Sequence, residues 1–199
     1  MMNKEELGKG LGLLGEILKG KGIEVPFRLL ICGGSALILS DLIERITKDV
    51  DILALGYYDS SGKISFKHPE VISLEFQSAA GEVSDILGWP KEWVNLGPAD
   101  LMRHGLPKGF EDRVLERKFG PVLIIYFLGR FDLIHLKLYA AVDQGPGKHL
   151  EDLLKLNPSP NEIKSSSVWA MIHDSSPGFR LSLKQMLEVL GYGSIAEEL

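Results

Sequence analysis

Two acidic side chains, Asp49 and Asp51, stand two residues apart in a short apolar run that extends to Leu55. Side chains on a β-strand alternate between its faces, so both carboxylates would leave the same side, with Cα atoms roughly 6.5 Å apart. Val50 and Ile52 would point the other way, into a core. Two carboxylates in this arrangement can hold a hard divalent cation, and Mg²⁺ is the usual choice where a substrate phosphate completes the coordination shell.

A glycine turn supplies the second half of a possible site. Gly33, Gly34 and Ser35 follow an apolar run over residues 29–32 that predicts a buried strand, and they precede an apolar segment that predicts a helix over residues 36–44. Glycine lets the backbone approach a ligand closely, and N–H groups at a helix N-terminus attract anions. We therefore expect this turn to hold the β- and γ-phosphates of a nucleotide. The alternative is an ordinary tight turn beside a solvated strand edge.

The two motifs together resemble the signature of the polymerase-β-like nucleotidyltransferase superfamily. The residues that carry the resemblance are Gly33, Gly34, Ser35, Ala36 and Leu37, followed by Arg45, Thr47, Asp49 and Asp51. The resemblance implies that Arg45 and Thr47 also belong to the nucleotide site. From the residues alone, Arg45 either reaches a phosphate or pairs with a nearby acid. Thr47 either hydrogen-bonds the turn or simply leads into the strand.

A second group of residues lies toward the C-terminus. Lys137 falls among apolar neighbours in a predicted helix over residues 132–142, with Asp132 as its N-cap, and Asp152 falls in a predicted helix over residues 148–156. A lysine in such a place either extends to solvent or meets an anion. The segment is similar to one in uncharacterised bacterial nucleotidyltransferase-like proteins and in abortive-infection toxins of toxin–antitoxin pairs. That similarity implies that Lys137 contacts nucleotide phosphate and that Asp152 orients basic or metal-bound groups.

The sequence departs from the family pattern at a third carboxylate, which many members carry on a later strand. Residues 121–128 give the strongest strand pattern in the chain and contain no acid. Glu75 falls in a predicted helix and Asp112 in a charged segment, and neither is a clear substitute. A third carboxylate normally helps to activate the attacking hydroxyl as well as to bind metal. The departure therefore leaves both a catalytic and a non-catalytic interpretation open.

The elements that must position these residues predict an α+β fold, with a mixed β-sheet flanked by helices. Apolar residues three or four positions apart predict helices over residues 3–20 and 69–87. We expect a nucleotidyltransferase-like core over residues 1–128 and a helical subdomain over residues 129–199 that packs on it. Residues 89–110 predict a long irregular stretch, and such stretches often line a site.

Composition limits the classes of function. Of the 199 residues, 45% are apolar, which is enough for a core, and the net charge of −5 argues against non-specific binding to DNA. No apolar run approaches the roughly 20 residues of a membrane span. Cys32 is the only cysteine, so no intrachain disulfide can form. These features favour a cytoplasmic protein without a membrane partner.

The sequence thus favours a Mg²⁺-dependent nucleotidyltransferase. It would move a nucleoside monophosphate from a nucleoside triphosphate to a hydroxyl of an RNA, a protein or a small molecule, and the family resemblance adds a possible antitoxin partner. The alternative is a non-catalytic member of the same fold that binds nucleotide or a protein partner.

Overall fold

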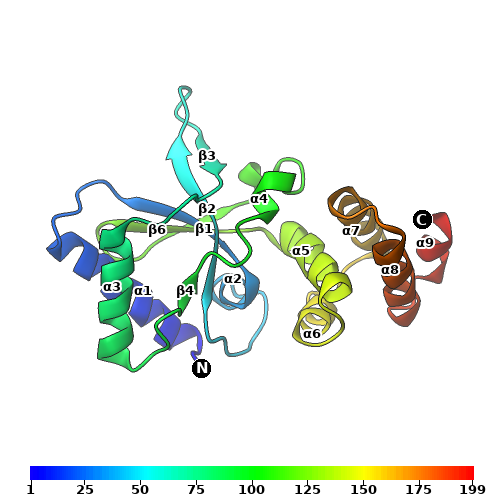
Figure 1. The fold of residues 1–199 in the computed structure, drawn as a ribbon, viewed down its shortest axis with the longest axis horizontal. Helices are drawn as coiled ribbons and strands as arrows, with labels where there is room; N and C mark the ends of the chain where they lie inside the picture. The colour runs from blue at the N-terminus through cyan, green and yellow to red at the C-terminus, as the bar shows by residue number, and fades with distance from the viewer. The chain divides into compact units, whose positions relative to one another are not determined.

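The computed structural model describes all residues from 1 to 199 and divides into two compact units (Figure 1). Unit 1 spans Met1–Gly129 and contains every strand, whereas unit 2 spans Arg130–Leu199 and is helical. The boundary lies one residue beyond the one expected from the sequence. A mixed sheet flanked by helices confirms the predicted α+β fold class.

The sheet of unit 1 has β1 at its centre. Its strands are β1 (Phe27–Cys32), β2 (Val50–Tyr58), β3 (Ile64–Lys67), β4 (Val94–Asn95), β5 (Leu115–Lys118) and β6 (Leu123–Phe127). The order is β3-β2-β1-β6-β5, and β4 pairs with β2. Strand β1 runs antiparallel to β2 and parallel to β6, and both neighbours bury apolar residues. The middle of the sheet therefore combines β1 and β2 with β6, which lies far from them in the sequence.

Four α-helices and a 3₁₀ turn complete unit 1. They are α1 (Lys4–Gly20), α2 (Gly33–Leu39), α3 (Leu74–Leu87), α4 (Leu101–His104) and the turn η1 (Phe110–Asp112). Helix α1 begins with a capping box, in which Asn3 and Glu6 each accept a backbone N–H from the other residue. Helix α3 contacts the sheet where the ring of Phe76 meets that of Phe27, with ring centroids 5.1 Å apart.

Unit 2 consists of five helices. They are α5 (Arg130–Asp143), α6 (Lys148–Lys155), α7 (Pro160–His173), α8 (Pro177–Val189) and α9 (Gly193–Glu198). Helices α7 and α8 both begin with serine followed by proline, because a serine side chain caps a free N–H and proline suits the first helical position. Tyr139, Trp169 and Phe179 bring aromatic rings from three helices together. No helix of the chain is both long and apolar enough to cross a membrane.

Several predicted boundaries were wrong for local reasons. Helix α2 ends at Leu39 instead of residue 44, because the backbone of Asp41 turns into the left-handed region at φ +60°. Helix α3 begins at Leu74 instead of residue 69, because the Ser73 hydroxyl accepts the N–H of Phe76 and caps the helix there.

Other differences concern the strands and the last helices. Residues 56–58 belong to β2 and form a hairpin with β3, although the apolar run that predicted the strand ends at Leu55. Strand β5 lies within the charged segment 110–118, and all four of its residues are exposed, as suits an edge strand. Helix α5 begins at Arg130, so Asp132 lies buried in its first turn instead of capping it. The remainder of unit 2 contains three helices after α6.

The glycines of α1 give a matched test of this packing. A Cβ at Gly12 would meet nothing within 4 Å, whereas a Cβ at Gly15 would overlap the backbone carbonyl of Phe119. We expect Gly12→Ala to raise the free energy of unfolding by about 0.5–1 kcal/mol, because alanine is the better helix former. We expect Gly15→Ala to lower it by about 1–3 kcal/mol through overpacking. Urea denaturation followed by circular dichroism measures both, and equal effects would contradict the packing of α1.

Candidate active site

The pairing of β1 with β2 places the glycine turn beside Asp51. Cys32, the last residue of β1, is the register partner of Asp51, and α2 begins at the next residue, Gly33. Gly33 has φ +69°, and a Cβ built on it would overlap the Asp51 carboxylate. Glycine is therefore required here both for its backbone conformation and for the space that the carboxylate occupies.

Thr47 joins the other carboxylate to the same turn. Its side chain is buried, and its hydroxyl oxygen lies 3.2 Å from the carbonyl oxygen of Asp49 and 3.4 Å from Oδ1 of that residue. A Cβ on Gly34 would lie 3.1 Å from the same hydroxyl oxygen and 3.4 Å from Cζ of Arg45. The structure thus brings Asp49, Thr47, Arg45 and the second glycine together.

The N-terminus of the chain fixes the segment that carries Thr47. Met2 is fully buried, its N–H donates to the carbonyl of Thr47 at 2.5 Å, and the N–H of Thr47 donates back at 2.9 Å. This isolated bridge holds residues that lie outside any helix or strand. The segment between α2 and β2 is thereby positioned although it has no regular structure of its own.

The side chain of Ser35 hydrogen-bonds within the protein and does not face a ligand. Its side chain is fully buried, and the hydroxyl donates to the carbonyl of Cys32 at 3.2 Å. Cys32 occupies the N-cap position of α2 and provides no side-chain capping bond. The serine hydroxyl therefore stabilises the turn. An anion would be bound by the backbone N–H groups of the turn.

Sequence reasoning missed Asn95, which contacts Asp51 directly. Its side-chain amide donates to Oδ1 of Asp51 at 3.2 Å, and its own carbonyl oxygen accepts the N–H of Gly97 at 2.8 Å. The second bond orients the amide, because only the NH₂ end then remains for the carboxylate. The only signal in the sequence was that residues 89–110 form an irregular stretch of the kind that lines sites.

Trp93 anchors the strand that carries Asn95. Its side chain is fully buried, and its indole N–H donates to the carbonyl of Ala80 in α3 at 2.9 Å. The carbonyl of Trp93 in turn accepts the N–H of Val50 at 2.6 Å. Trp93 is therefore a core residue that fixes β4 against β2, and Trp89 packs edge-on against it with ring centroids 5.0 Å apart.

No group of three or more histidine, cysteine or acidic side chains is placed to hold a metal ion. Asp112 pairs with Lys63 at 2.8 Å on the surface, and Glu75 lies exposed in the first turn of α3. Glu116 on β5 is a strand acid that the sequence did not reveal. It lies three strand positions from β2, which corresponds to about 14 Å, so it does not complete the site around Asp51.

Glu116 instead accepts a hydrogen bond from the hydroxyl of Tyr126 on β6, at 2.8 Å. Burial, reinforced by this carboxylate, raises the pKa of the Tyr126 hydroxyl above its ordinary value. The hydroxyl therefore stays protonated and keeps donating. This pair is a structural link between the last two strands of the sheet.

Lys137 and Asp152 meet each other inside unit 2. Nζ of Lys137 lies 2.7 Å from a carboxylate oxygen of Asp152, and the two residues are 4% and 1% exposed. The predicted alternatives for the lysine were solvent or an anion, and here the anion is a carboxylate of the same unit. A buried ion pair of this kind loses much stability when one partner is removed, because the other charge is left unpaired.

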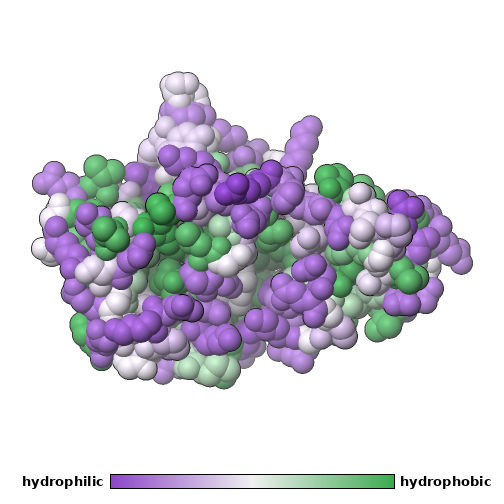
Figure 2. Space-filling model, viewed as in Figure 1, coloured by the Kyte–Doolittle hydropathy of each residue, from purple (hydrophilic) through white to green (hydrophobic).

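Two hollows each have one residue of the candidate site in their lining, and neither is lined by the glycines or by Asp49 or Asp51. One, of about 450 Å³, is lined by Arg45, Glu44 and the start of α1. The other, of about 580 Å³, is lined by Asn95 together with apolar, polar and charged residues of α3, of the segment before α3 and of residues 91–96. Apolar side chains gather around the N-terminal end of α3 on the face shown in Figure 2.

No protein family, curated protein or solved structure matches this chain. The assignment of a function therefore depends on the residues and their geometry.

The buried pair in unit 2 gives a direct test of its energetic role. We expect Lys137→Met and Asp152→Leu each to lower the free energy of unfolding by about 3–5 kcal/mol, and the double variant to lose much less than their sum. Urea denaturation of the four proteins measures the coupling. The exposed pair Lys164–Glu198 is the matched control, and Lys164→Met should cost less than about 1 kcal/mol. Additive losses at Lys137 and Asp152 would contradict a buried pair.

Proposed function

We propose that this protein is a Mg²⁺-dependent nucleotidyltransferase whose site is formed by the glycine turn and by Asp49 and Asp51. The observation that carries the proposal is the packing of the Asp51 carboxylate against Gly33, with Thr47 joining Asp49 to Gly34. The glycine turn and the pair of acids are each weak evidence for a function when taken alone, and here they lie side by side. The linked pattern resembles that of polymerase-β-like nucleotidyltransferases, and the proximity of Gly33 to Asp51 supports the proposal.

The donor set fits a hard divalent cation. Asp49 and Asp51 offer carboxylate oxygens, which are the ligands that Mg²⁺ prefers, and a bound triphosphate would complete the coordination shell. Such an ion would neutralise charge on the phosphates and polarise the α-phosphorus. Asn95 holds one oxygen of Asp51, so the carboxylate is oriented before any ligand arrives.

The chain's own groups then position the nucleotide. The N–H groups of Gly33 and Gly34 would donate hydrogen bonds to β- and γ-phosphate oxygens. Arg45 lies beside Gly34 and would counter the negative charge of the phosphates. An acceptor hydroxyl would attack the α-phosphorus and release its proton to solvent, while the bond between the α-phosphorus and the bridging oxygen breaks and pyrophosphate leaves. Catalysis of this kind depends on positioning and on electrostatic stabilisation. The roles that the resemblance gives to Lys137 and Asp152 remain predictions.

Titration of Mg²⁺ and each of ATP, CTP, GTP and UTP into the protein tests the binding site. We expect Asp49→Asn and Asp51→Asn to weaken binding of the preferred nucleotide by about tenfold or more, because each removes a charged ligand of the metal. Isothermal titration calorimetry measures the effect.

Asp112→Asn is the matched control, since it changes the net charge equally at an exposed ion pair of the same unit. It should bind the preferred nucleotide within about twofold of wild type, because exposed charges are well screened. Equal binding by wild type and by both site variants would defeat the proposal.

A second candidate function is favoured by one observation, the lack of a third acid near the two carboxylates. In this alternative the protein binds nucleotide without transferring it, and acts as a sensor or as a protein-interaction partner. Incubation with α-³²P-labelled nucleotides, using total cellular RNA and protein as acceptors, separates the two. Label transfer that is lost in Asp51→Asn supports the enzyme, whereas binding without transfer supports the sensor. The acceptor, an antitoxin partner and a cytoplasmic location stay predictions from the sequence.

A further inference from the structure

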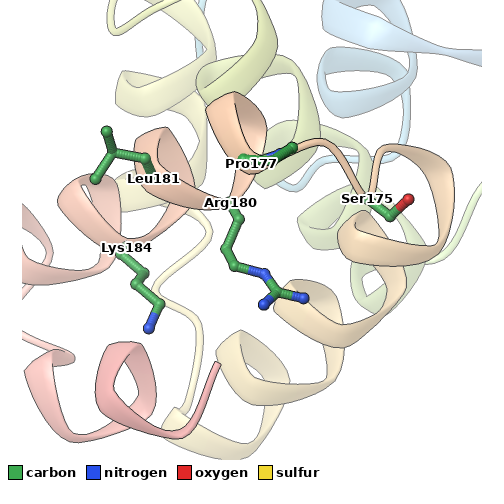
Figure 3. Close-up of a pocket in the computed structure, with 5 residues that line it drawn as sticks. All are labelled: Ser175, Pro177, Arg180, Leu181 and Lys184. Atoms are coloured by element: carbon green, nitrogen blue, oxygen red, sulfur yellow. The ribbon is translucent and has the colours of Figure 1, made fainter.

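A basic hollow lies in unit 2, and none of the residues that would bind metal or nucleotide at the proposed site lines it. It measures about 320 Å³ and is lined by Ser175, Pro177, Arg180, Leu181 and Lys184 (Figure 3). Arg180 and Lys184 are four residues apart on α8, so they share one face of the helix. Figure 3 shows both side chains extending into the same space, with Ser175 across from them on the segment that leads into α8.

The polar groups of this basic hollow have no partner within the protein. The side chains of Arg180 and Lys184 form no ion pair or hydrogen bond, the Ser175 hydroxyl forms none, and no acidic residue lines the hollow. Two other cations of unit 2 are paired, Arg130 with Glu162 and Lys164 with Glu198. Like charges at positions i and i+4 of a helix repel each other. An anion between them would remove that repulsion.

The lining residues specify the chemistry of the anion. Two fixed positive charges match a phosphate monoester, which carries about −1.5 to −2 at neutral pH. A guanidinium group binds phosphate oxygens through two parallel N–H bonds, and the ammonium and hydroxyl groups add further donors. Pro177 and the exposed side chain of Leu181 give the hollow an apolar wall that inorganic phosphate would not use. We propose that this hollow binds a phosphate monoester that carries an organic group, such as a nucleotide.

An NMR titration of the ¹⁵N-labelled full chain tests the proposal residue by residue. Four probes separate the contributions of the ligand: AMP, adenosine, inorganic phosphate and the phosphodiester ApA. We expect AMP to shift the amide signals of residues 175–184 at lower concentration than the other three. Shifts of these signals by adenosine at the same concentration as AMP, or by none of the four probes, would overturn the proposal.

A pair of double variants with equal changes in charge sharpens the test. We expect Arg180→Gln/Lys184→Gln to weaken AMP binding at the hollow by about tenfold or more, because two charged hydrogen-bond donors are lost. Lys148→Gln/Lys155→Gln removes two exposed cations from α6 and should change it by less than about twofold, because salt screens distant charges. Equal losses in both double variants would show general attraction and contradict a site.

Two oligoribonucleotides of one sequence, with and without a 5′-phosphate, distinguish the source of the monoester. A preference for the phosphorylated oligonucleotide would assign the hollow to an RNA terminus. Binding of AMP without such a preference would assign it to a free nucleotide. The test is independent of the proposed function, because signals of residues 33–51 report on the other site and Asp51→Asn should leave AMP binding at the hollow unchanged.

Discussion

The contact between the Asp51 carboxylate and the α-carbon of Gly33 is the constraint on which the rest of the candidate site depends. It exists because Cys32 pairs with Asp51 in the central antiparallel ladder, so that one strand ends where the acid of its neighbour projects. Any side chain at position 33 would displace the carboxylate or strain the backbone, since φ there is +69°. The pairing of β1 with β2 thereby determines where the Asp51 carboxylate lies relative to Gly33.

Three distant segments converge on this contact and hold it in place. The N-terminus bridges to Thr47, the short strand β4 brings Asn95 to Asp51, and the buried Trp93 fixes that strand to α3. Each connection satisfies polar groups in a region that has little regular structure. The carboxylates are therefore oriented by bonds already present in the folded chain, so binding a ligand would require little reorganisation.

The sequence predicted the parts of the site that depend on local patterns. The alternation around Asp49 and Asp51 and the glycine pair are short-range features. The structure places Asp51 in β2 and Asp49 just before it, because β2 begins at Val50, and it makes residues 33–35 the first turn of α2 instead of a separate turn. Asn95 could not be predicted, because it meets Asp51 across 44 residues and through a two-residue strand with no pattern of its own. The edge strand β5 was hidden by its exposed, charged residues. Lys137 illustrates the same limit, because the sequence left solvent and an anion as alternatives and did not identify Asp152 as its partner.

Crystals of the protein grown with Mn²⁺ and a non-hydrolysable nucleoside triphosphate analogue would test the central claim most directly. Mn²⁺ replaces Mg²⁺ at oxygen ligands and can be located by its anomalous scattering. The account predicts an anomalous peak bound by both Asp49 and Asp51, with the triphosphate lying over Gly33 and Gly34. A nucleotide and metal bound elsewhere on the protein, with these carboxylates unliganded, would contradict it.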